Sequence, residues 1–258
     1  MYVVEVTKIM GKVTGLAFLL MTAWLLLASL LLGQLHSHPF DVILAVASIV
    51  VPHEAMHALV AKIVGGKKLS MGVWKAGKRI VLGFYVCLEE TLPRNRWVLV
   101  AAAPLLLSLL AIVLAATFNT PLRGYFTWFA VLNAVGCSGD LALILYAVSA
   151  GKHVSIKDGG YYIGIEGGTP SPKTLIVLNS LAAAGYALLA LYILMMLLTP
   201  LATMKGSINV LGVEIAKMRM VDNVVVVSFS QWFYALACLM TIVSSISVLV
   251  YSLKRIPF

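Results

Sequence analysis

The chain alternates long apolar stretches with shorter polar segments. A helix needs about 20 apolar residues to cross the roughly 30 Å hydrocarbon core of a membrane. The stretches that meet this length are 13–33, 39–64, 97–118, 124–149, 174–199 and 230–253. The pattern predicts an all-α polytopic membrane protein with about six transmembrane helices, which together form a single transmembrane domain over residues 1–258.

The longer polar connections contain β-prone runs and predict short β-hairpins at the membrane surfaces. One such run lies in residues 65–96. Residues 151–173 place an Asp-Gly-Gly turn, beginning at Asp158, between two more runs. Glycine in such a turn favours a hairpin. Residues 206–229 hold two runs rich in valine and isoleucine, so we expect a further hairpin on the opposite side of the membrane.

Composition strengthens the membrane interpretation. Apolar residues make up 61% of the chain and charged residues 11%, whereas a soluble domain carries about 45–50% and roughly 25%. Part of any globule must face water, so a soluble protein of this length could not hide so much apolar surface. The cysteines Cys87, Cys137 and Cys238 form no C-x-x-C pair, and therefore predict neither a disulfide framework nor a thiolate zinc site.

The net charge of +9 predicts a topology rather than a nucleic-acid partner. No basic run is interleaved with the aromatic residues on which bases stack, so no nucleic-acid binding is expected. Basic residues precede the first stretch, follow the last, and crowd the connections after the second and fourth stretches. With six spans these positions fall on one side, which predicts an integral, multi-pass protein of the cell membrane with cytoplasmic N- and C-termini.

The candidate chemistry begins with an H-E-x-x-H motif inside the second apolar stretch, formed by His53, Glu54 and His57. Residues four apart share one face of a helix, so the two imidazoles can bind one zinc ion. Glu54 can then reach a metal-bound water as a general base. Ionisable groups inside a membrane are costly and mark functional sites. The motif therefore predicts Zn²⁺ as the cofactor; a structural polar cluster is the alternative.

A catalytic zinc ion takes three protein ligands, and Asp140 is the candidate for the third. It is the one carboxylate in the fourth apolar stretch, and a buried carboxylate needs a positive partner. The alternatives are a hydrogen bond from Asp140 to a neighbouring hydroxyl or histidine, with Glu89, Glu90 or His153 as the ligand instead.

Two further residues of these spans invite a functional interpretation. Asn133 lies two helical turns before Asp140, and either binds the substrate backbone or the oxyanion, or bridges two helices by a hydrogen bond. Pro52 cannot donate a backbone hydrogen bond, and either weakens the helix enough to admit water or is an ordinary transmembrane proline.

These elements together resemble the site-2 protease class of intramembrane zinc metalloproteases, and still more a group of small membrane proteins described as "putative zincin peptidases". The resemblance runs over roughly residues 40–150, with weaker similarity around Asp158 to Ile163. It joins the motif helix, a surface β-segment near 70–90, an alanine-rich A-x-P stretch at Ala101-Ala102-Ala103-Pro104, and a helix with Asn133 and then Asp140. This chain departs from the site-2 class in having Gly-Asp-Leu at Asp140 and no proline after Asn133.

The resemblance implies a zinc-dependent endopeptidase that cleaves membrane-protein or peptide substrates, within or beside the lipid bilayer and near its cytoplasmic face. Its metalloprotease core would be about 39–150, with additional helices and hairpins over 151–258. A non-catalytic zinc-binding scaffold, a transporter, or a zinc hydrolase acting on lipids or small amides are the alternatives. A transporter would need polar residues along a path through both leaflets, and the six stretches contain few of them.

Overall fold

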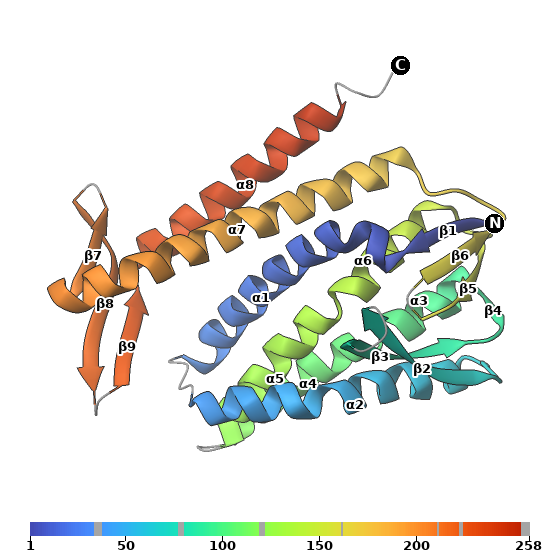
Figure 1. The fold of residues 1–258 in the computed structure, drawn as a ribbon, viewed down its shortest axis with the longest axis horizontal. Coiled ribbons are helices and arrows are strands. Elements are labelled where there is room, and N and C mark those ends of the chain that lie inside the picture. Colours follow the sequence, from blue (N-terminus) through green and yellow to red (C-terminus); the bar gives the residue numbers. More distant parts are fainter. Residues whose placement is uncertain are drawn as a thin grey trace.

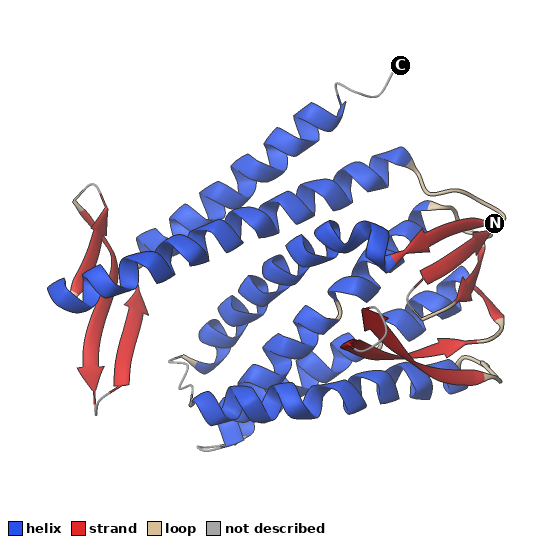
Figure 2. Ribbon diagram, in the orientation of Figure 1, coloured by secondary structure: helices blue, strands red, loops and turns tan. Residues whose placement is uncertain are grey.

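A computed structural model of the chain describes residues 1–33, 38–76, 80–118, 122–160, 162–210, 212–221 and 224–253. Long helices laid side by side make up most of the described chain, with small sheets at the two ends of the helical layer (Figures 1 and 2). In the described residues six helical segments are long and apolar enough to cross a membrane. They are Val6–Leu32, Pro39–Ile63, Arg94–Thr117, Leu122–Ser149, Pro172–Leu194 and Gln231–Tyr251. The predicted fold class is confirmed.

Four of the spans are built on one continuous helix each, and two are divided. The continuous helices are α1 (Met10–Leu32), α2 (Pro39–Ile63), α7 (Pro172–Lys205) and α8 (Gln231–Leu253). The third span consists of α3 (Arg94–Ala102) and α4 (Pro104–Thr117), and the fourth of α5 (Leu122–Gly136) and α6 (Ser138–Ser149). A one-turn 3-10 helix, Val6–Ile9, precedes α1.

The proline in the third span explains its division. Pro104 has no N–H, so it cannot bond to the carbonyl four residues earlier, and its ring crowds that turn. The helix accordingly restarts with Pro104 at its first position, where a missing N–H costs nothing. Pro52, by contrast, lies within the continuous helix α2.

The predicted hairpins form, and two of them are part of larger sheets. Strands β2 (Leu69–Ala76) and β3 (Ile80–Leu88) pair as an antiparallel hairpin. Strands β5 (Ser155–Asp158) and β6 (Tyr162–Glu166) pair as the second hairpin, at the same end of the helices. The third predicted hairpin is a three-stranded sheet of β7 (Ser207–Val210), β8 (Val213–Val221) and β9 (Val224–Phe229), at the opposite end (Figure 2).

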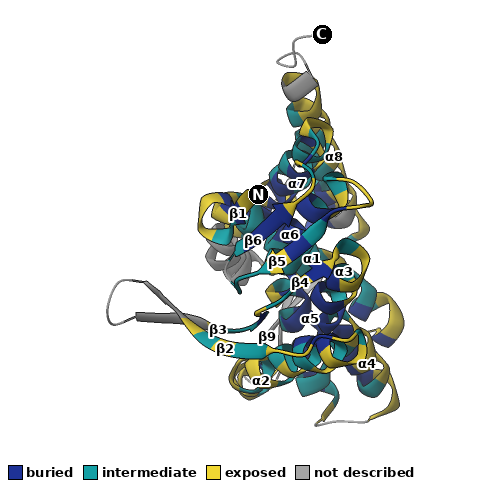
Figure 3. Ribbon diagram, turned by 90° about the vertical axis from the view of Figure 1, so that its right-hand side faces the viewer, coloured by how far each residue is buried: buried dark blue, intermediate teal, exposed yellow. Residues whose placement is uncertain are grey.

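The second hairpin gains a strand on either side. The N-terminal strand β1 (Tyr2–Glu5) pairs with β6, and β4 (Thr91–Pro93) pairs with β5, giving a four-stranded sheet of order β1-β6-β5-β4. The apolar side chains of this sheet are buried against the helices in one cluster that includes Ile156, Ile163, Trp97, Val100 and Leu143. This cluster fixes the sheet to α3 and α6, while β2 and β3 extend to one side of the helices (Figure 3).

Candidate metal centre

The two histidines of the motif project from one face of α2, as their four-residue spacing predicts. The ring centroids of His53 and His57 lie 5.1 Å apart, with the rings edge to face. His57 is buried, and His53 is partly buried. Both rings face the fourth span.

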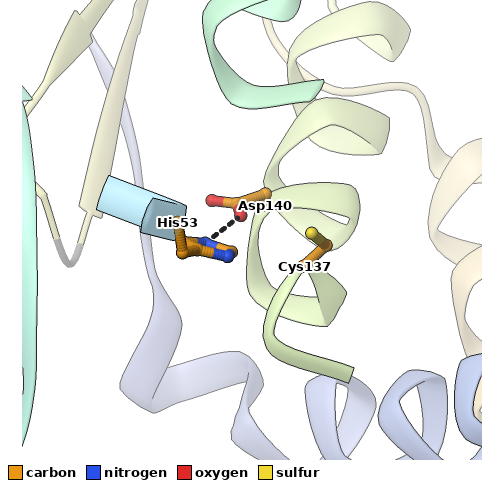
Figure 4. Close-up of side chains that lie close together, drawn as sticks. All are labelled: His53, Cys137 and Asp140. Carbon is orange, nitrogen blue, oxygen red and sulfur yellow. Dashed lines mark ion pairs between the residues drawn. The ribbon is translucent and has the colours of Figure 1, made fainter. Parts of the chain in front are cut away.

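Asp140, in the first turn of α6, brings a carboxylate oxygen between these rings. Its Oδ2 atom lies 3.4 Å from Nε2 of His53 and 3.5 Å from Nε2 of His57; Figure 4 shows the first of these pairs. Both distances are longer than a good hydrogen bond. Two ligand atoms held about 2.0–2.1 Å from a tetrahedral zinc ion lie about 3.3 Å apart. Each nitrogen–oxygen separation, taken by itself, is close to that of two ligands on one zinc ion.

The other nitrogen of each ring is engaged, and this determines which nitrogen is free for a metal. His57 Nδ1 lies 2.9 Å from the carbonyl oxygen of Val100, which can only accept, so Nδ1 carries the proton. His53 Nδ1 lies 3.0 Å from the side-chain oxygen of Asn133 and donates to it. Both Nε2 atoms consequently keep a lone pair. Such outer partners orient metal-ligating histidines and raise their basicity.

Asn133 reaches His53 because its amide is fixed from the other side. Its nitrogen Nδ2 donates to the carbonyl of Pro104 at 2.6 Å and to the hydroxyl of Ser108 at 2.8 Å, so its oxygen faces His53. Asn133 is fully buried and does not line the cavity beside the histidines. Of its two predicted roles, these contacts favour the helix-bridging hydrogen bonds over a contact with substrate.

Glu54 lines a cavity of about 170 Å³ together with both histidines and Asp140. Its Oε2 atom accepts a hydrogen bond of 2.8 Å from the backbone N–H of Val86, in strand β3. The hairpin thus passes over the motif helix and holds the glutamate at the cavity. Phe84, Val86 and Leu88 of β3 supply part of the apolar wall.

A carboxylate outside the H-E-x-x-H motif also lines this cavity. Asp158, at the end of β5, lines the same cavity and accepts a hydrogen bond of 3.0 Å from the indole N–H of Trp97. Its other oxygen accepts one of 2.8 Å from the N–H of Gly160. Gly160 has a φ of +79°, and the ring of Tyr85 occupies the space that a Cβ would need. The Asp-Gly-Gly pattern predicted the turn but not its place beside the histidines.

The remaining candidate ligands, Cys137, Glu89, Glu90 and His153, do not line the cavity. Cys137 Sγ, a His53 ring nitrogen and an Asp140 oxygen all lie within 4.8 Å of one another (Figure 4), but Cys137 does not line the cavity. Glu89 and His153 are exposed. Glu90 accepts a hydrogen bond from the backbone N–H of Lys67. None of these three lines the cavity, so the described residues bring together His53, His57 and Asp140, with Glu54 next to them.

The fold and the site define a class: a multi-pass membrane protein whose second and fourth spans bring two histidines and an aspartate to one cavity, beside a glutamate. Two histidines and a carboxylate can supply three ligands to a zinc ion and leave a fourth position open. The model of the family described as "Putative zincin peptidase" matches residues 46–155, a range that contains all four residues. The resemblance to the small membrane proteins of that description is therefore confirmed, and the description indicates a zinc metallopeptidase.

One curated relative is similar over part of its length. Over 131 residues the chain is 28% identical to a Pyrococcus woesei protein named "Uncharacterized 24.7 kDa protein in gap 5'region". The match covers 50% of this chain and 56% of that protein. No solved structure matches the chain.

Proposed function

We propose that this protein is a zinc-dependent intramembrane endopeptidase, which hydrolyses peptide bonds of membrane-spanning substrates close to the cytoplasmic face. One observation carries the proposal: Asp140 Oδ2 lies 3.4 and 3.5 Å from the two histidine Nε2 atoms, in a cavity that Glu54 also lines. A structural zinc site is closed by four protein ligands, whereas hydrolysis needs a position left open for water. The family match over residues 46–155 supports the same chemistry.

The residues of the site have distinct roles in this proposal. His53, His57 and Asp140 would hold the zinc ion, which would act as a Lewis acid and make water more acidic. Glu54 takes the proton of the attacking water and passes it to the leaving amine. The N–H of Val86 holds one oxygen of Glu54, which leaves the other oxygen for the water. Asn133 and the Val100 carbonyl keep both histidines in the tautomer that ligates through Nε2.

The free edge of β3 supports a role in presenting an unwound substrate. In the described part of the chain β3 pairs with β2 alone. The N–H of Val86 points away from β2, toward Glu54, so this edge borders the cavity. An extended segment could add to such an edge through main-chain hydrogen bonds. The added segment would then pass beside the zinc ligands. Cleavage of a membrane-spanning helix requires this position, because the helix must first unwind locally and bring its peptide bond to the metal.

The test combines zinc content with cleavage. The full-length protein is purified in detergent, loaded with zinc, and assayed on a reporter containing one membrane-spanning helix. We expect Glu54→Gln to retain zinc and lose cleavage, since it keeps the ligands and removes the base. Asp140→Ala should lose both, whereas Cys137→Ser, which alters a residue outside the cavity, should keep zinc. Full zinc occupancy in Asp140→Ala would exclude the third ligand, and zinc binding without cleavage of any peptide would favour a scaffold.

A further inference from the structure

Asp158 lies at the cavity without belonging to the zinc ligands. Each of its oxygens accepts one hydrogen bond, from Trp97 and from the N–H of Gly160. A carboxylate has about four lone-pair sites, so acceptor capacity remains. The residue is intermediate in burial and lines the same cavity as His57 and Glu54.

A short chain of contacts connects Asp158 to the metal centre. Trp97, which donates to Asp158, is three residues before Val100 on α3, and the Val100 carbonyl accepts from His57. Residues three apart are neighbours on a helix face. Trp97 and Val100 thus connect Asp158 and His57 through one face of α3, and all four residues line the same cavity.

The Asp158 carboxylate has no cationic partner among the described residues. No lysine or arginine in that part of the chain forms an ion pair with it, and none lines the cavity. Burial raises the pKa of Asp158 above its ordinary value, in spite of the two hydrogen bonds. The ionised carboxylate is thus incompletely compensated, and a cation placed beside it would stabilise the charged form.

The charges of the site with zinc bound indicate that a substrate group beside Asp158 would be positively charged. A zinc ion contributes two positive charges, while Glu54, Asp140 and Asp158 contribute three negative charges when ionised, which leaves one in excess. Membrane-spanning segments carry lysine and arginine at their cytoplasmic ends. A substrate cleaved near that face would bring such a residue to the sheet that contains Asp158.

We propose that Asp158 is a specificity-determining residue, which binds the lysine or arginine side chain of a substrate residue close to the scissile bond. This inference rests on the proposed peptidase function and names its substrate class: membrane-spanning segments with a basic residue just beyond their cytoplasmic end. Trp97 and Gly160 fix the carboxylate, and the substrate cation takes the remaining acceptor sites.

The experiment uses the full chain in lipid vesicles and a set of synthetic peptides. Each peptide has one apolar spanning segment and a short flank, in which a single position carries lysine, glutamine or leucine. Cleavage rates give a lysine-to-glutamine ratio at every flank position. Binding of the same peptides to the Glu54→Gln protein, measured by fluorescence anisotropy, gives a second ratio that does not depend on turnover.

We expect wild type to prefer lysine at one flank position by on the order of 10-fold or more, as for a partly buried charge pair. Asp158→Asn should bring both ratios close to unity, and Asp158→Glu should restore part of the preference. Glu166→Gln, which alters an exposed carboxylate of the same sheet, should keep it. A wild-type ratio near unity, or a preference that survives in Asp158→Asn, would overturn the inference.

Two further results separate this inference from the proposed function. Loss of zinc from Asp158→Asn would show that the residue supports the fold of the metal centre, and would overturn the specificity role. Absence of all peptide cleavage in wild type would refute the peptidase function. The anisotropy ratio would still decide whether Asp158 binds the cation.

Discussion

Replacement of Asn133 by alanine tests the arrangement of the metal centre most directly. The side chain makes three hydrogen bonds, at 3.0 Å to His53, 2.6 Å to the Pro104 carbonyl and 2.8 Å to Ser108. Asn133→Ala removes all three and leaves His53 Nδ1 without its acceptor. The imidazole can then rotate or change tautomer, which would place the proton on the nitrogen that ligates zinc.

The expected magnitude follows from these contacts. Loss of the outer partner of a metal-ligating histidine typically lowers metal affinity 10–100-fold, or about 1.4–2.7 kcal/mol. Hydrogen bonds between membrane helices average about 0.6 kcal/mol each, so three of them contribute about 2 kcal/mol to stability. Asn133→Ala should therefore bind zinc at least tenfold more weakly and unfold more readily.

Ser108→Ala is the matched control, because it removes one bond of Asn133 and leaves the bond to His53 intact. Zinc affinity is measured by competition with a chelator of known affinity, and stability by thermal unfolding of the metal-free protein. Ser108→Ala should lose some stability and retain the zinc affinity of wild type. If Asn133→Ala, shown to be folded, binds zinc as tightly as wild type, the proposed support of His53 is refuted.

Three further predictions concern the walls of the cavity. Val86→Pro removes the N–H from which Glu54 accepts a hydrogen bond, and should lower the cleavage rate by on the order of 10-fold with zinc retained. Val86→Ala keeps the N–H and should keep the rate. Equal cleavage rates in the two variants would exclude a role for the hydrogen bond between Val86 and Glu54. Gly160→Ala introduces a Cβ at positive φ into the Tyr85 ring and should destabilise by at least about 1 kcal/mol in chemical unfolding; adding Tyr85→Ala should recover part of this loss. Because burial raises the pKa of Asp158 above 3.8, its stabilising contribution is present below that pH and is lost as the pH rises through the raised value. Asp158→Asn should accordingly flatten the fall in Tm above pH 3.8 in zinc-free protein; an unchanged slope would contradict this.

The spans and hairpins could be predicted because local physics determines them. Hydrocarbon thickness sets the length of an apolar stretch, and glycine turns mark hairpins. The four-stranded sheet could not be predicted, since β1 pairs with β6 across more than half of the chain. No local signal records such a partner. The division of the third span was obscured because an apolar average over the stretch conceals a single proline.

The candidate site likewise contains residues that the sequence predicted and supporting groups that it did not. His53, Glu54, His57 and Asp140 are side chains whose cost in a membrane makes them conspicuous in the sequence. Their supports are largely backbone groups. The Val100 carbonyl and the Val86 N–H have no sequence signal. Every residue has a backbone carbonyl, and every residue except proline has a backbone N–H. Asn133 was identified, but its role depends on which atoms face it, which only the packing of α4 against α5 decides.

The break in the third span connects these backbone supports to a single residue. In an unbroken helix the Val100 carbonyl would accept a hydrogen bond from the N–H of residue 104, and Pro104 has none to give. That carbonyl instead accepts from Ala103 and from His57 Nδ1. The Pro104 carbonyl in turn accepts from Asn133, whose oxygen faces His53. Pro104 therefore leaves the Val100 carbonyl free to accept from His57, and its own carbonyl positions Asn133, the acceptor of His53. In this way the third span supports both histidines of the motif on α2.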